Sequence, residues 1–201
     1  MTLPSSKFLA GTRRFVIIDP APTGKKEQEH LLAAIENRIT GGDRPEAIVL
    51  SHHHIDHVGA LDAVQERWSL PCWGHRRTAE LLGRSFDREL DEGDLIDLGD
   101  SPAGAAGWKL RCLFTPGHAE GHLAFFDGRH RALLAGDLIS TLVSMYVGTP
   151  GGHLETYFRS DRKSTRQNSS HVRTSYAVSC LKKTTQVEQG SALCRTSLGH
   201  L

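Results

Sequence analysis

The sequence offers little that would place the protein in a membrane or on nucleic acid. No apolar run approaches the roughly 20 residues that a transmembrane helix needs. The 24 basic residues nearly balance the 23 acidic ones, so no strong field attracts nucleic acid or a charged lipid surface. The N-terminal residues also lack the basic and then apolar segments of a secretory signal. We therefore expect neither a membrane nor nucleic acid as the main partner, and the sequence leaves the oligomeric state open; the small-molecule substrate that we also expect follows from the motifs described below.

Cysteine is scarce, and its spacing excludes two common frameworks. The four cysteines, Cys72, Cys112, Cys180 and Cys194, form neither a Cys-x-x-Cys pair nor a dense disulfide pattern. Cys72 and Cys112 lie inside apolar segments, where cysteine acts as a small core residue in a reducing compartment. A cytoplasmic location is expected. The length of 201 residues suits one domain, or one domain with an appendage.

What the sequence has in abundance is histidine at one place. Four of the twelve histidines fall between positions 52 and 57, in the pattern His52-x-His54-x-Asp56-His57, directly after an apolar run. Imidazole and carboxylate together are the ligands that zinc and similar metals prefer. Alternate side chains of an extended segment point the same way, so His52 and His54 can bind one ion, while Asp56 and His57 can face a second. A solvated histidine-rich loop is the alternative, but a strand and a helix frame the cluster.

The chain up to about residue 160 alternates between strand patterns and helix patterns. Continuous apolar runs predict buried strands, and apolar residues spaced along one helical face predict helices. The expected strands are 15–18 (with 6–9 as its hairpin partner), 46–50, 71–73, 94–99, 108–114, 122–126 and 131–135, and the expected helices are 27–39, 56–68 and 77–82. Asp56 is the expected N-cap of the second helix. This alternation predicts an α/β domain built of layers.

Two further polar side chains stand at strand ends beside glycine. His118 lies in a Pro-Gly turn between two expected strands, and Asp137 follows Gly136 at the end of another. Alone, each would be an ordinary turn residue. Because sites in layered α/β folds assemble from loops at strand ends, we expect both to join the histidine cluster. Asp137 can bridge two cations, since a carboxylate has two oxygens.

Four motifs occur in a fixed order between residues 6 and 160. They are Val-Ile-Ile-Asp-Pro-Ala-Pro, Ser-His-His-His-Ile-Asp-His, Thr-Pro-Gly-His-Ala-Glu-Gly-His and Leu-Ala-Gly-Asp. Together they resemble the metallo-β-lactamase-fold hydrolase superfamily, and its glyoxalase-II-like members in particular. The resemblance implies an αβ/βα layered sandwich, in which two mixed sheets carry outer helices. It also implies a binuclear metal site.

The resemblance implies a role for the polar residues of these motifs. Two Zn²⁺ ions would be bound, with iron or manganese as the other candidates. The implied ligands are His52, His54 and His118 for the first ion, Asp56 and His57 for the second, and Asp137 as the bridge. Asp19 would orient a ligand histidine through a hydrogen bond. Four other histidines have weaker claims and are expected to be structural or solvated: His75, His122, His130 and His153.

The chemistry that the resemblance implies is metal-assisted hydrolysis. A zinc-activated hydroxide, oriented by Asp56, would attack a small ester, thioester or lactone. One alternative within the same superfamily is a mononuclear iron dioxygenase that oxidises persulfides, with His52, His118 and Asp137 as its ligands. Sequence spacing does not separate the two hypotheses, whereas metal content does.

The composition changes near Ser160. Residues 161–175 are almost wholly Arg, Lys, Ser, Thr, Asn and Gln, and residues 161–183 resemble the conceptual translation of a short-read sequencing adapter. We therefore expect a partial domain at 1–160 and a non-native, poorly folded tail at 161–201, with an ordinary basic tail as the alternative. A further metal-binding histidine, which the family places on a late strand, has no counterpart before this change. The C-terminal half of the fold is then incomplete, which makes an inactive truncated fragment the other hypothesis.

Overall fold

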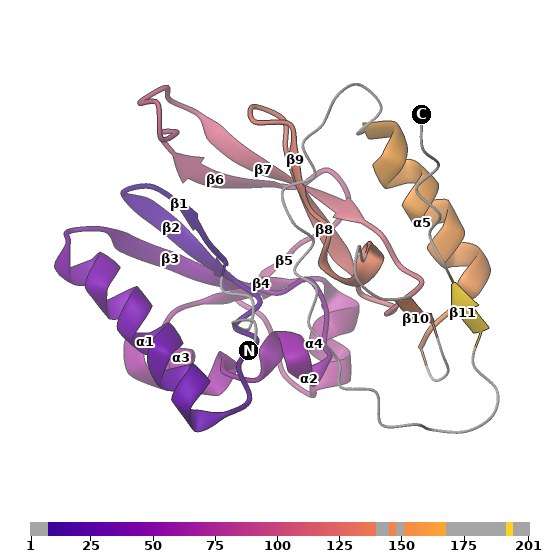
Figure 1. The fold of residues 1–201 in the computed structure, drawn as a ribbon, viewed down its shortest axis with the longest axis horizontal. Coiled ribbons are helices and arrows are strands. Elements are labelled where there is room, and N and C mark those ends of the chain that lie inside the picture. Colours follow the sequence, from indigo (N-terminus) through magenta and orange to yellow (C-terminus); the bar gives the residue numbers. More distant parts are fainter. Residues whose placement is uncertain (1–7, 140–144, 148–150, 168–191, 195–201) are drawn as a thin grey trace.

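Two stacked β-sheets with helices on their outer sides form the protein (Figure 1). The computed structural model describes residues 8–139, 145–147, 151–167 and 192–194. The predicted class, a layered α/β sandwich of two sheets with outer helices, is confirmed. Within the described ranges, no helix is long and apolar enough to cross a membrane.

The first sheet is mixed and has the strand order β1-β2-β3-β4-β5. β1 (Phe8–Gly11) runs antiparallel to β2 (Arg14–Ile18), and β3 (Arg44–Val49), β4 (Cys72–Gly74) and β5 (Arg88–Glu89) follow β2 in parallel. Parallel neighbours need long crossover connections, which helices supply. The helices between these strands are α1 (Lys25–Thr40), α2 (Ile55–Val58), α3 (Leu61–Trp68) and α4 (Arg76–Leu82).

The second sheet is antiparallel and has the strand order β6-β7-β8-β9. Its strands are β6 (Leu95–Gly99), β7 (Trp108–Phe114), β8 (Leu123–Asp127) and β9 (Ala132–Leu134). β9 leads into one turn of 3-10 helix, η1 (Gly136–Leu138), and helix α5 (Leu154–Gln167) lies against the outer side of the sheet (Figure 1). Two short strands, β10 (Met145–Val147) and β11 (Ala192–Cys194), form a separate antiparallel pair.

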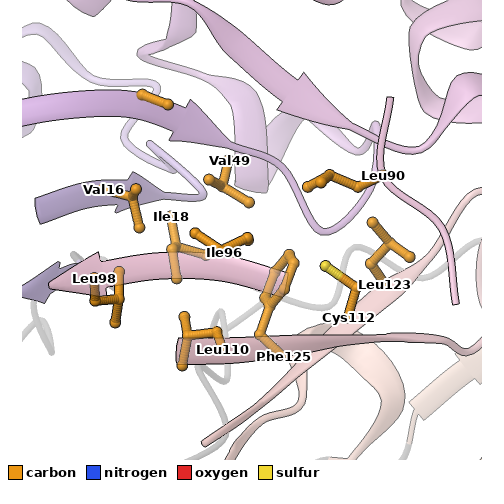
Figure 2. Packing of buried hydrophobic residues seen from close by; sticks show 11 residues of the cluster. Val16, Ile18, Val49, Leu90, Ile96, Leu98, Leu110, Cys112, Leu123 and Phe125 are labelled. Carbon is orange, nitrogen blue, oxygen red and sulfur yellow. The ribbon is translucent and has the colours of Figure 1, made fainter. Parts of the chain in front are cut away.

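Three apolar clusters hold the layers together, because the central strands bury both of their faces. Along β2, Phe15 and Ile17 pack with α1 and α3, whereas Val16 and Ile18 pack with the second sheet. Figure 2 shows this middle cluster, in which side chains of β2 and β3 meet those of β6, β7 and β8. The third cluster lies under α5 and includes the fully buried ring of Tyr157. The continuous apolar runs of the sequence therefore mark strands between two layers.

The single helix predicted at 56–68 is two helices in the structure, α2 and α3. A Cβ at Gly59 would lie 2.7 Å from the carbonyl oxygen of Pro22, so the backbone between the helices passes directly against the segment after β2. The prediction of Asp56 as the N-cap is also wrong. Helix α2 begins at Ile55 with His54 as its N-cap residue, so Asp56 lies within the helix. The residues of the histidine motif thus continue from an extended segment into one helical turn.

Helix α5 crosses the boundary that we predicted near residue 160. It continues to Gln167, with Ser160 and Ser164 buried. The Ser160 hydroxyl donates a hydrogen bond to the carbonyl oxygen of Pro116 at 2.7 Å. Because this part of the helix packs serine rather than an apolar residue inwards, apolar periodicity did not indicate it. Most of the predicted tail lies outside the described residues, and its suggested origin stays a prediction.

Replacement of Gly117 by alanine should destabilise the fold, because the turn between β7 and β8 packs backbone against backbone on α5. The φ angle of Gly117 is +138°, and a Cβ there would lie 2.3 Å from Tyr157 Cα and 2.4 Å from Tyr157 N. We expect Gly117→Ala to lower the free energy of unfolding by about 2–3 kcal/mol, measured by urea denaturation.

Gly128→Ala provides the matched control. A Cβ at Gly128 would lie 3.6 Å from Phe126 Cε1, which is ordinary contact, and Gly128 has no positive φ. Its free energy of unfolding should change by less than about 0.5 kcal/mol. Equal stability of the two variants would contradict the close packing of this turn against α5.

Candidate metal centre

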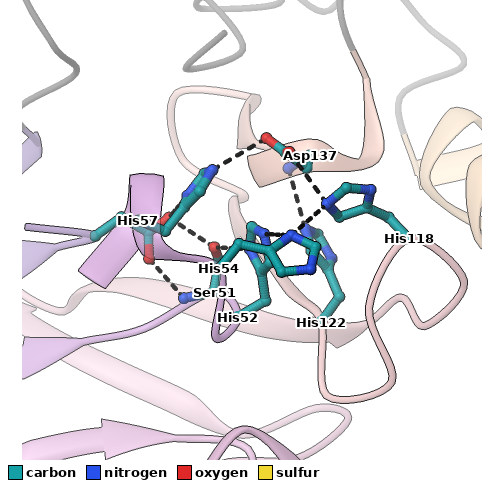
Figure 3. A network of polar contacts seen from close by, with 8 residues as sticks. Ser51, His52, His54, His57, His118, His122 and Asp137 are labelled. Carbon is teal, nitrogen blue, oxygen red and sulfur yellow. Dashed lines mark hydrogen bonds and ion pairs between the residues drawn. The ribbon is translucent and has the colours of Figure 1, made fainter. Parts of the chain in front are cut away.

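The predicted site residues meet where strands of both sheets end. His52 and His54 follow β3, His118 lies in the turn between β7 and β8, and Asp137 lies in η1 directly after β9. Figure 3 shows their side chains turned towards one another from these separate segments. The site is therefore created by the packing of the two sheets and not by one segment alone.

Four side chains form a compact group of possible ligands. His52 Nε2 lies 3.1 Å from His54 Nδ1, which in turn lies 2.9 Å from His118 Nε2. His118 Nε2 also lies 3.1 Å from Asp137 Oδ2. One ligand atom from each of the four residues lies within 4.8 Å of all the others, so a single ion can reach them all.

Ser51 determines which nitrogen of His52 faces this group. The Ser51 hydroxyl donates its one hydrogen to Asp19 Oδ2 at 2.6 Å, so its oxygen can only accept from the His52 ring. His52 Nδ1, at 3.0 Å from Ser51 Oγ, therefore carries the proton, and Nε2 keeps its lone pair. That lone pair is directed at the group of four.

The donor set fits a divalent cation. Burial, followed by the nearby His57, lowers the pKa of His52 well below its ordinary value, so the ring is neutral, as a metal ligand must be. His54 Nδ1 lies 3.1 Å from His52 Nε2 and 2.9 Å from His118 Nε2, so a cation that replaces the protons shared here can bind all three nitrogens. Imidazole nitrogen with a carboxylate oxygen suits zinc and is also found around iron.

His57 links Asp19 to Asp137 beside this group. His57 Nδ1 lies 2.9 Å from Asp19 Oδ2, and His57 Nε2 lies 3.1 Å from Asp137 Oδ1. Burial by itself lowers the pKa of His57, but the Asp19 charge and the hydrogen bonds to both carboxylates outweigh burial and raise the pKa to about 10. Positive charge is therefore favoured at this position next to Asp137, where we predicted the second ion.

The two buried carboxylates occupy different places in the arrangement. Asp19 follows β2 with a φ angle of +46°, a conformation that aspartate tolerates, and accepts the backbone N–H of Ser51 at 2.7 Å. Burial opposes ionisation of Asp137, yet hydrogen bonds from His118 and His57 hold its pKa far below the usual range. One oxygen of Asp137 faces His118 and the other faces His57, so the two oxygens point to different histidines.

His122 holds Asp137 in place, which is more specific than the structural or solvated histidine that we expected at this position. The buried ring accepts the backbone N–H of Asp137 at Nε2 (3.1 Å), and its Nδ1 lies 2.8 Å from Thr115 Oγ1. Burial, together with His118, lowers the pKa of His122 to about 3, so Nε2 stays available as an acceptor. A Cβ at Gly136 would lie 2.6 Å from Nε2, so this contact needs glycine there. The available signal was the second histidine of Thr-Pro-Gly-His-Ala-Glu-Gly-His.

The structure brings the predicted residues together to different extents. The three predicted ligands of the first ion and Asp137 form one group, and His57 joins them through Asp137. Asp56 lies on α2 directly before His57, half-buried, and stands outside the group of four. The division into two ion sites and the catalytic role of Asp56 stay predictions.

The remaining histidines that we considered make local contacts. The ring of His75 stacks on Phe114 with centroids 4.5 Å apart. His130 Nδ1 lies 2.6 Å from Asp127 Oδ2, and His153 accepts a backbone hydrogen bond at the start of α5. The group of four in Figure 3 includes none of them.

Comparison with known protein sequences gives related hydrolases. The sequence profile of the Metallo-beta-lactamase superfamily matches residues 4–175. The probable metallo-hydrolase YqgX of Bacillus subtilis (strain 168) is 29% identical over 163 residues, which are 76% of this chain and 74% of that protein. The hydroxyacylglutathione hydrolase of Chelativorans sp. (strain BNC1) is 29% identical over 149 residues, 71% of this chain and 54% of that protein. The chain thus spans only about half the length of that hydrolase.

Solved structures share the arrangement of layers. TTHA1623 in a di-iron-bound form superposes with a TM-score of 0.61 and 29% identity, covering 81% of this chain and 82% of that chain. The BLEG-1 B3 metallo-β-lactamase superposes with a TM-score of 0.60 and 24% identity, covering 78% of this chain and 77% of that chain. ETHE1 from Myxococcus xanthus superposes with a TM-score of 0.61 and 20% identity, covering 78% of this chain and 63% of that chain. The last two likenesses concern the fold alone.

The stability of the metal-free protein should be greatest near pH 6.5. The pKa of His122 falls from 6.5 to about 3 on folding, so its contribution is present above pH 6.5 and is lost as the pH falls towards 3. The pKa of His57 rises from 6.5 to about 10, so its contribution is present below pH 6.5 and is lost as the pH rises towards 10. Urea denaturation of chelator-treated protein at a series of pH values measures both effects.

The variant His57→Gln separates the acid-side loss of stability from the alkaline-side loss. It should remove most of the loss between pH 6.5 and 10 and leave the loss on the acid side, because His122 still has to become charged on unfolding. A wild-type stability that does not change between pH 6.5 and 10 would show that His57 is not held as an imidazolium between its carboxylates.

Proposed function

Because this chain belongs to the metallo-β-lactamase superfamily, we propose that it is a metal-dependent hydrolase of a small ester, thioester or lactone. The observation that carries the proposal is the convergence of one ligand atom from each of His52, His54, His118 and Asp137 within 4.8 Å. Three histidines and a carboxylate in this geometry are a ligand set for a catalytic cation. The packing of a hydrophobic core does not require polar side chains that face one another in this way.

The proposed binding sites follow the predicted division. His52, His54 and His118 would hold the first Zn²⁺, Asp56 and His57 the second, and Asp137 would lie between them. Support for a second ion comes from the two oxygens of Asp137, which face different histidines, and from the favoured positive charge at His57. Iron or manganese fits the same ligands, and one similar structure is described as di-iron-bound.

The side chains of the site would divide the work of hydrolysis. A cation held here would supply Lewis acidity and would lower the pKa of a water towards about 7, which would make hydroxide available at neutral pH. Asp56 would orient that hydroxide towards the substrate. Asp19 keeps the ring of His57 in place through Nδ1, and His122 keeps Asp137 in place through its backbone N–H.

The substrate class rests on the relatives and on charge. Several relatives are hydroxyacylglutathione hydrolases, whose name describes a glutathione conjugate as the substrate. The chain covers about half of such a protein, so the thioester is proposed by likeness and not by a binding site. The near balance of 24 basic and 23 acidic residues favours a small substrate over nucleic acid. The buried free thiols of Cys72 and Cys112 support a cytoplasmic location.

Metal content tests the proposal directly. Purified protein loaded with zinc should contain about two ions per chain by elemental analysis, and His54→Ala should lower zinc affinity at least about tenfold, since it removes a ligand from the group. His153→Ala is the matched control, because His153 makes its contact at the start of α5. One iron per chain with oxygen uptake would replace the hydrolase by the persulfide dioxygenase. Two zinc ions without hydrolysis of any ester, thioester or lactone would favour the inactive fragment.

Asp56→Asn should separate catalysis from folding. The amide keeps the size of the side chain but loses the charge that would orient the hydroxide, so kcat for a hydroxyacylglutathione thioester should fall about 100-fold or more. The thermal stability of the metal-free protein should change little. Asp62→Asn on α3 is the control, since Asp62 is exposed and pairs only with Arg84 among the described ion pairs. An unchanged kcat in Asp56→Asn would remove Asp56 from the mechanism.

A further inference from the structure

Helix α4 packs directly against the loop that carries His118. This loop, residues 115–122, joins β7 to β8 in the second sheet, whereas α4 follows β4 in the first sheet. The contact therefore crosses between the two halves of the fold. No motif in the sequence pointed to it.

Thr78 makes the central contact between the helix and the loop. Its side chain is fully buried, and its hydroxyl donates a hydrogen bond to the carbonyl oxygen of Gly121 at 3.0 Å. The backbone N–H of Thr78 donates to the carbonyl oxygen of His75 at 2.9 Å, so only the side chain of Thr78 bonds to the loop. The hydrogen bond of the Thr78 hydroxyl therefore attaches the loop to α4.

Gly121 shows how closely the loop approaches the helix. A Cβ at this position would lie 2.5 Å from Thr78 Oγ1, 2.6 Å from Thr78 N and 3.2 Å from Arg77 C. No side chain fits between the two backbones. Gly121 has no positive φ, so its backbone conformation does not require glycine. The close approach of the loop to α4 does.

A second contact lies at the edge of the first. Arg77 Nε lies 2.5 Å from Glu120 Oε2, and Arg77 Nη1 lies 2.8 Å from Glu80 Oε2. These side chains are exposed, so solvent weakens the attraction, and we assign the main contribution to Thr78. The pair still fixes the side of α4 on which the loop residue Glu120 lies.

The residues on either side of Gly121 reach the candidate metal centre. His118, three positions before it, contributes Nε2 to the group of four, and His122, the next residue, accepts the backbone N–H of Asp137. The loop thus carries one member of the group and holds another. A shift of Gly121 would move both.

We propose that Thr78 is a positioning residue for the metal centre. By fixing Gly121 against α4 it sets His118 directly, and it sets Asp137 through His122. This inference rests on the proposed metal-binding function and adds to it a residue of α4 that does not itself reach the ion.

Thr78→Val tests the inference, because valine keeps the shape of the side chain and loses the hydroxyl. Zinc affinity, measured by competition with a chromophoric chelator, should fall about tenfold or more, and the visible absorption spectrum of the Co²⁺-loaded protein should change. Thr78→Ser, which keeps the hydroxyl, should stay within about twofold of wild type and keep its spectrum. Thr78→Ala, which adds no bulk, serves the same purpose if Thr78→Val does not fold.

Ile35→Val on α1 controls for a loss of stability alone. Ile35 is fully buried in the cluster between α1 and the first sheet, and this cluster includes no residue of the loop 115–122. This variant should be destabilised but should bind zinc and Co²⁺ like wild type.

The outcomes separate the two proposals. Wild-type affinity and spectrum in Thr78→Val, or equal losses in Thr78→Val and Ile35→Val, would overturn the positioning role while leaving the metal site intact. Wild-type protein that binds no zinc and no Co²⁺ would overturn the proposed function and the positioning role with it.

Discussion

At the site, one buried histidine held between two carboxylates links the two sheets. Asp19 belongs to the first sheet through β2, Asp137 follows the last strand of the second sheet, and His57 contacts both within 3.1 Å. Two buried carboxylates this close to each other are unfavourable without a positive charge between them. In the metal-free protein the proton on His57 provides that charge. The same electrostatic demand makes the position suitable for a cation.

Glycine allows the segments around this charge to approach. Gly136 lets His122 reach the backbone of Asp137, Gly121 lets the His118 loop lie on α4, and Gly59 lets α2 turn against the segment that carries Asp19. In each case a Cβ would come within 2.8 Å of an atom of the neighbouring segment. A site assembled from strand ends thus needs close backbone contacts as much as it needs ligands.

The sequence predicts those parts of the protein whose signal is local. The spacing of His52, His54 and His57 indicates a metal site because one short segment contains it, and the apolar runs indicate β2 and β3 because both faces of these strands are buried. The contacts of His122 with Asp137 and of Thr78 with Gly121 could not be predicted in this way, since the partners lie 15 and 43 positions away. The inner side of α5 was missed because it is built partly of serine.

The dependence of the site on α5 sets an order in which the protein can complete its structure. The Tyr157 hydroxyl donates a hydrogen bond to the carbonyl oxygen of Leu138, next to Asp137, and the backbone of Tyr157 lies against Gly117, next to His118. During synthesis the histidine motif emerges from the ribosome about a hundred residues before this support, since chains grow from the N-terminus. The nascent chain therefore carries the residues of the candidate metal centre before the helix α5 that supports Leu138 and Gly117 has emerged.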